Sequence, residues 1–97
     1  MKMILIALNE ALESELIEAL EACCPNLAYT QWREVLGRGH RSEPHLRSHV
    51  WPKANHVIMT CVEDAMANRM MNTVRSLRER RGAEGIKAFL LPVEDVT

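Results

Sequence analysis

Met3-Ile4-Leu5-Ile6-Ala7-Leu8 is an uninterrupted apolar run that is followed at once by the polar residues Asn9 and Glu10. A short run that is apolar at every position is typical of a strand inside a sheet, covered on at least one face. Asn9 is a suitable helix cap, because its side chain can accept a hydrogen bond from an amide of the next turn. The start of the chain therefore predicts a central strand that leads directly into a helix.

The segment between Asn9 and Pro25 has the pattern of an amphipathic helix. Its apolar side chains recur at helical spacing, and they are Leu12, Leu16, Ala19, Leu20 and Cys23. Glutamates fill the other face, and Pro25 ends the pattern because proline cannot continue a helix. We expect a helix that is buried on its apolar side, with Cys23 and Cys24 as buried, unreactive thiols.

A second amphipathic helix is predicted between Glu63 and Arg81. Its apolar stripe is formed by Met66, Met70, Val74 and Leu77, and methionines at this spacing are typical of a core. Arginines crowd the last turns, where positive charge suits the helix dipole. Because the first helix is acidic outside and the second is basic outside, we expect the two charged faces to compensate each other.

Three further strands complete the expected fold. Tyr29–Leu36 mixes aromatic, β-branched and polar residues, which suits a half-exposed strand, whereas His56–Val62 and Ile86–Leu91 are mainly apolar. The order strand, helix, strand, strand, helix, strand predicts a ferredoxin-like α+β sandwich. In this fold an antiparallel sheet carries two helices on one face. We expect a single domain over residues 1–97.

The composition excludes several classes of protein. The chain has 97 residues and a formal net charge of −1, so its overall charge gives no basis for binding nucleic acid. The apolar runs are far shorter than the roughly 20 residues of a transmembrane helix. Three cysteines, two of them adjacent, suit a reducing compartment better than a disulfide framework. We expect a cytoplasmic protein without a nucleic-acid partner and without direct membrane insertion.

Three segments also carry a family likeness. Met1-Lys2-Met3-Ile4 opens the first strand, and Gly37-Arg38-Gly39 follows the second. The third is Gly85-Ile86-Lys87-Ala88-Phe89-Leu90-Leu91-Pro92-Val93-Glu94-Asp95-Val96, which spans the last strand. Together they resemble the nitrogen regulatory P-II family over essentially the whole chain. In that family the second segment enters a long loop called the T-loop, and the third contains the shorter B-loop.

The resemblance implies a regulatory protein of nitrogen metabolism that works as a homotrimer. Small effectors, commonly adenine nucleotides such as ATP or ADP, would bind between neighbouring subunits. The T-loop, here the shorter segment 40–54, would then dock on a regulated enzyme or membrane transporter. This segment contains no tyrosine, so the family's usual acceptor for uridylylation is absent. The B-loop differs too, because Ile86 is inserted between Gly85 and Lys87.

Six residues are candidates for the effector site, on the strength of this resemblance: Gly37, Arg38, Gly39, Arg41, Gly85 and Lys87. Glycines allow backbone amides to approach a phosphate or another anion closely, and the cationic side chains would attract it. The alternatives are simple turn glycines and surface cations. No Ser-His-Asp or Cys-His arrangement, paired carboxylates or Walker loop stands out, so we expect no enzymatic activity.

The segment 40–54 supports a rival hypothesis of metal binding. Three histidines lie in it and one follows it, and they are His40, His45, His49 and His56. Imidazoles can bind Zn²⁺, Cu²⁺ or Ni²⁺, although this spacing matches no established metal signature. The alternative is a polar docking loop. Trp51 is expected either to pack on a neighbouring subunit or to anchor a partner, and Trp32 to lie in the core or in the trimer interface.

Overall fold

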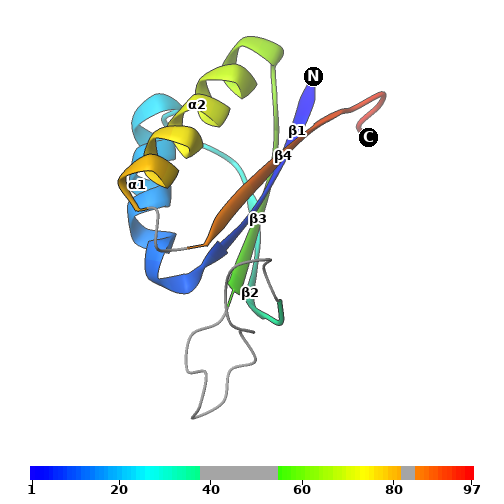
Figure 1. Cartoon of the computed structure of the whole chain (residues 1–97). Coiled ribbons are helices and arrows are strands. Elements are labelled where there is room, and N and C mark those ends of the chain that lie inside the picture. Colours follow the sequence, from blue (N-terminus) through cyan, green and yellow to red (C-terminus); the bar gives the residue numbers. More distant parts are fainter. Residues whose placement is uncertain (38–54, 82–84) are drawn as a thin grey trace.

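The computed structural model describes residues 1–37, 55–81 and 85–97. It confirms the predicted order of elements and the ferredoxin-like α+β architecture, with two helices on one side of a sheet (Figure 1). The predicted T-loop segment 40–54 lies outside the described residues. The elements are β1 (Lys2–Asn9), the 3₁₀ helix η1 (Glu10–Leu12), α1 (Glu13–Cys23), β2 (Thr30–Val35), β3 (Asn55–Val62), α2 (Asp64–Arg80) and β4 (Ile86–Pro92).

The sheet has four strands in the order β2-β3-β1-β4, and every neighbouring pair is antiparallel. β1 is one of the two inner strands, as its continuous apolar run predicts. Leu5 lies opposite Met59 of β3 on one side and Phe89 of β4 on the other. β2 and β4 are consequently the two edges of the sheet.

The core lies between the sheet and the two helices. Ile4, Ile6 and Leu8 alternate along β1 and are buried on the helix-covered face. They belong to one apolar cluster with the predicted stripes of both helices, including Leu16, Leu20, Met70, Val74 and Leu77. Cys23 and Cys24 differ from the prediction, because they are half-buried where α1 ends and only pack against the edge of this cluster.

The first helix begins differently from the prediction of one continuous α-helix. The side-chain oxygen of Asn9 accepts a hydrogen bond from the amide of Ala11 at 2.9 Å, which confirms Asn9 as a cap. The turn that it caps is the 3₁₀ helix η1, and α1 starts only at Glu13. This tighter turn places Glu10 and Glu13 near the end of the sheet.

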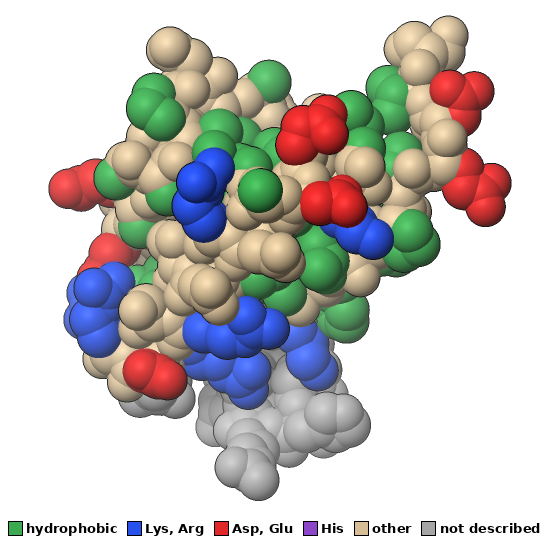
Figure 2. Space-filling model, turned by 90° about the horizontal axis from the view of Figure 1, so that it is seen from above, with side chains coloured by type: hydrophobic (Ala, Val, Ile, Leu, Met, Phe, Trp, Pro, Cys, Tyr) green, Lys and Arg blue, Asp and Glu red, His purple; other side chains and the backbone are tan. Residues whose placement is uncertain are grey.

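Among the described residues, an ion pair joins the basic end of the second helix to the acidic first helix. Arg81 Nε lies 2.9 Å from Glu15 Oε2 and so links the end of α2 to α1. At the other end of α2, the N-terminal amine of Met1 lies 3.1 Å from Asp64 and holds the pKa of this carboxyl below its ordinary value. Seen from above, basic and acidic side chains are spread over this face, several of them side by side, with hydrophobic ones among them (Figure 2). Neither α1 nor α2 is long and apolar enough to cross a membrane, within the residues described.

The face of the sheet away from the helices is largely apolar. Cross-strand partners share a face, so the register groups these residues on it: Met3, Leu5, Ala7, Trp32, Val57, Met59, Phe89 and Leu91. Trp32 and Phe89 are 47% and 46% exposed. Trp32 therefore does not lie in the core of the subunit. Of its two predicted positions, the one in the trimer interface stays a prediction.

Candidate functional site

Four strand ends meet at one end of the sheet. Val35 and Asn9 both lie opposite Asn55, and Leu8 lies opposite Ile86. The backbone amide of Asn9 also donates to the carbonyl of Gly85 at 2.8 Å. The three described residues of the predicted effector site, Gly37, Gly85 and Lys87, therefore belong to this end of the sheet, and the chain termini lie toward the other end (Figure 1).

The same residues stand on opposite edges of the sheet. Gly37 follows the edge strand β2, whereas Gly85 and Lys87 belong to the edge strand β4. Three inter-strand spacings separate these edges, which is about 14 Å. One subunit therefore does not bring Gly37 and Lys87 into a single binding site. Arg38, Gly39 and Arg41 lie outside the described residues.

The two glycines differ in what their surroundings demand. A Cβ atom at position 37 would collide with the side-chain amide of Asn55, so any larger residue there would have to displace this amide. A Cβ atom at Gly85 would meet no heavy atom within 4 Å. Packing thus favours glycine at position 37, whereas Gly85 takes part through its carbonyl group.

Lys87 lies on the open, apolar face of the sheet. It is exposed, and its cross-strand partner on that face is Ala7. Its Nζ atom lies 5.9 Å from the centre of the Phe89 ring, within the range of a cation–π interaction. Lys87 therefore presents a positive charge beside hydrophobic side chains, where an anion could reach it.

His56 points to the opposite, helix-covered face and is only 5% exposed. Its Nδ1 atom lies 3.2 Å from Glu13 Oε2, and its Nε2 atom lies 3.7 Å from Glu10 Oε2. Within residues 1–37, 55–81 and 85–97, no group of three His, Cys, Asp or Glu side chains could hold a metal ion. The remaining predicted metal ligands, His40, His45 and His49, lie outside the described residues, as does Trp51, so metal binding there stays a prediction.

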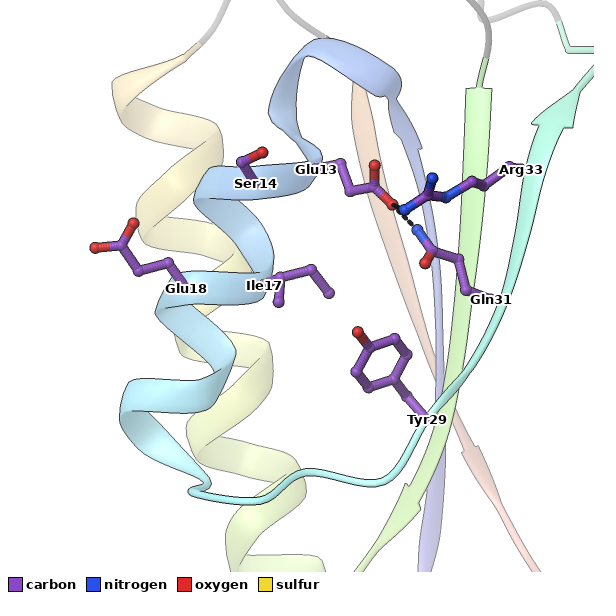
Figure 3. Close-up of a pocket in the computed structure, with 7 residues that line it drawn as sticks. All are labelled: Glu13, Ser14, Ile17, Glu18, Tyr29, Gln31 and Arg33. Carbon is purple, nitrogen blue, oxygen red and sulfur yellow. Dashed lines mark hydrogen bonds and ion pairs between the residues drawn. The ribbon is translucent and has the colours of Figure 1, made fainter.

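Glu13 forms a polar cluster that the sequence did not reveal. It accepts a hydrogen bond from the side chain of Gln31, and its Oε1 atom lies 3.4 Å from Arg33 Nη2. These residues line a shallow groove of about 340 Å³ between α1 and β2, together with Ser14, Ile17, Glu18 and Tyr29 (Figure 3). In the sequence Glu13 is one of many helix glutamates, and only the tertiary fold brings it to β2 and β3.

Comparisons with known proteins agree with this architecture. The chain matches the family model described as Nitrogen regulatory protein P-II over residues 1–97. The chain belongs to the P-II family. The family assignment from the sequence is therefore confirmed, and P-II proteins are signalling regulators. A comparison of this P-II chain with curated proteins gives no match.

Solved structures of PII-like proteins share the fold of this P-II chain. A protein from Thermus thermophilus, described as a PII-like signalling protein, is 25% identical, with a TM-score of 0.63 over 92% of this chain and 82% of its own. CPII from Thiomonas intermedia, bound to ADP, AMP and acetate, is 16% identical, with a TM-score of 0.74 over 99% and 88%. CPII bound to ADP and bicarbonate gives a TM-score of 0.68 at 16% identity, over 97% and 88%.

Proposed function

We propose that this P-II chain is a non-enzymatic, cytoplasmic signalling protein that works as a homotrimer. It binds an adenine nucleotide between neighbouring subunits and regulates an enzyme or a membrane transporter through the segment 40–54. The observation that carries this proposal is the placement of Gly37 and Lys87 on opposite edges of the sheet at the same end. Such a placement suits a site that two subunits build together.

The composite site combines two different contributions. The edge with Gly37 contributes the glycine at the end of β2, and the sequence places Arg38, Gly39 and Arg41 shortly after it. The edge with Gly85 and Lys87 contributes the positive charge. When the β2 edge of one copy meets the β4 edge of the next, the two contributions face the same anion.

The open face of the sheet supports assembly. It exposes large apolar side chains, among them Trp32, Phe89 and Leu91, at 41% to 47% of their surface. Contiguous apolar surface of this kind commonly marks an interface. A further copy of the chain covers it when three sheets pack with their open faces together, and small domains gain stability from such assembly.

The related structures and the charge at the site support a nucleotide as the ligand. The CPII structures hold ADP, AMP and small carboxylate or carbonate anions. Lys87 beside an apolar face suits a ligand that combines an aromatic base with phosphate groups. We therefore take ADP and AMP as the first ligands to test, followed by ATP and bicarbonate.

The test is calorimetric titration of ADP into wild type and Lys87→Ala. The loss of a hydrogen bond to a charged group should weaken binding about tenfold or more, while light scattering still shows a trimer. Lys2→Ala is the matched control, because Lys2 begins β1 at the other end of the same sheet. Unchanged affinity in Lys87→Ala would remove Lys87 from the site, and no binding of any nucleotide by wild type would overturn the proposed function.

A further inference from the structure

We propose that Glu13 is a positioning residue for the effector site. Its carboxylate connects α1 to the parts of β2 and β3 that determine where Gly37 lies. We name Glu13, Gln31, Arg33 and His56 the Glu13 clamp. The prediction about ligand affinity rests on the proposed function, whereas the prediction about local structure does not.

The clamp lies at an irregularity in the sheet. Trp32 lies opposite Val57, but the next paired residue of β2, Val35, lies opposite Asn55. Arg33 and Glu34 thus share the single partner position of His56, which defines a β-bulge. Glu34 has a φ of 57°, in the left-handed region that residues other than glycine seldom adopt. The regular ladder is therefore interrupted just before β2 ends.

Glu13 reaches both strands across this interruption. Gln31 lies before the bulge, Arg33 lies within it, and His56 lies opposite it. The carboxylate of Glu13 meets all three side chains, with Arg33 Nη2 at 3.4 Å and His56 Nδ1 at 3.2 Å. Figure 3 shows the side chain of Glu13 extending from the start of α1 toward Arg33 and Gln31. One side chain therefore connects a helix to β2 and β3 where the pairing of those strands is irregular.

The contact between Glu13 and His56 is largely buried, so its loss should affect the stability of this region. The side chains of Glu13 and His56 are 17% and 7% exposed. Within the described part of the chain, His56 Nδ1 has no hydrogen-bond partner. The charged group beside it is the carboxylate of Glu13, at 3.2 Å. Removing that carboxylate would take a charged neighbour from the buried imidazole and the acceptor from the Gln31 amide, which costs more than losing an exposed ion pair.

The bulge is close to the candidate site. Gly37 follows Val35 by two residues, and the side chain of Asn55, the cross-strand partner of Val35, lies directly against Gly37. A shift of the bulge would move both. Lys87 on β4 is outside the reach of the clamp. Glu13 therefore acts on the β2 side of the proposed site and leaves the β4 side in place.

The test compares Glu13→Ala and Glu13→Gln with wild type, using ADP titration and amide hydrogen exchange. Glu13→Ala should bind ADP about tenfold more weakly, within the usual range of coupling between sites. Its amides in Gln31–Val35 and Asn55–Val57 should exchange at least about tenfold faster, while the β1–β4 amides stay unchanged. Glu13→Gln retains an oxygen acceptor for Gln31 and Arg33 and should restore much of both properties.

Glu18→Ala is the matched control, because Glu18 lines the same groove on the same helix but points away from Arg33 and Gln31 (Figure 3). It should leave affinity and exchange unchanged. Equal exchange in Glu13→Ala and wild type would overturn the clamp, even if no nucleotide binds. Faster exchange with unchanged ADP affinity would overturn the positioning role. A wild type that binds no nucleotide would instead refute the proposed function and leave the exchange test of the clamp intact.

Discussion

Gly37 is the residue whose identity the structure explains most directly. Its backbone lies so close to Asn55 that a Cβ atom would collide with the amide group of that side chain. Sequence alone suggests Gly37 only as a turn residue or an anion-binding residue, because the contact depends on the pairing of β2 with β3. His56 shows the same limit, since a histidine beside a histidine-rich segment indicates a metal ligand until its two carboxylate neighbours are known.

We expect Gly37→Ala to destabilise the protein by about 1 kcal/mol, at the lower end of the cost of overpacking, because a side-chain amide can move more easily than backbone. Denaturant unfolding measures this change. Gly85→Ala is the control and should have a smaller effect, since open space surrounds that position. In an Asn55→Ala background the penalty of Gly37→Ala should shrink. An equal penalty in both backgrounds would show that the collision is not its cause.

Among the helices and strands, β2 differs most from its prediction. The composition of Tyr29–Leu36 indicates a half-exposed strand, and Thr30–Val35 forms one. Its bulge has no signal in the sequence, because Arg33 and Glu34 are neither glycine nor asparagine, the residues that favour a left-handed backbone. The 3₁₀ helix η1 was missed for a similar reason, since its residues suit an α-helix equally well.

The left-handed conformation of Glu34 leads to a prediction about this element. Glu34→Val should destabilise by about 1–2 kcal/mol, because a β-branched residue is strained at this φ. Glu34→Gly should stay within about 0.5 kcal/mol of wild type, since relief of strain offsets the greater freedom of the unfolded chain. Both variants lose the same carboxylate, so their difference in unfolding free energy isolates the backbone effect. Similar values for the two variants would contradict this account.

The apolar pattern of the sequence predicts the order of the helices and strands and most of the core. The continuous run in β1, the leucine stripe of α1 and the Met66–Leu77 stripe of α2 all pack into the one predicted core. What the pattern does not specify is the use of the second sheet face. Leu5, Met59 and Phe89 are apolar like core residues. Only the register shows that they lie on the face of the sheet that points away from the helices.

The open face of the sheet leads to a prediction about trimer formation. Phe89→Glu should convert the proposed trimer into a folded monomer, because a charge buried between subunits is costly whereas position 89 is 46% exposed in a single subunit. Light scattering measures the mass, and circular dichroism checks the fold. Ser76→Glu, on the exposed side of α2, should leave the assembly unchanged. A Phe89→Glu protein that remains trimeric would place the interface elsewhere.

The separation of Gly37 and Lys87 onto two edges also has a genetic meaning. Suppose that each cleft takes its β2 edge from one copy and its β4 edge from the next. A substitution at Gly37 then damages the edge that one subunit contributes, and a substitution at Lys87 damages the edge that the neighbouring subunit contributes. A cell that carries both defective alleles assembles mixed trimers, and each mixed trimer contains one cleft with both edges intact. Two alleles that are inactive alone would then complement each other, whereas two alleles with defects on the same edge would not.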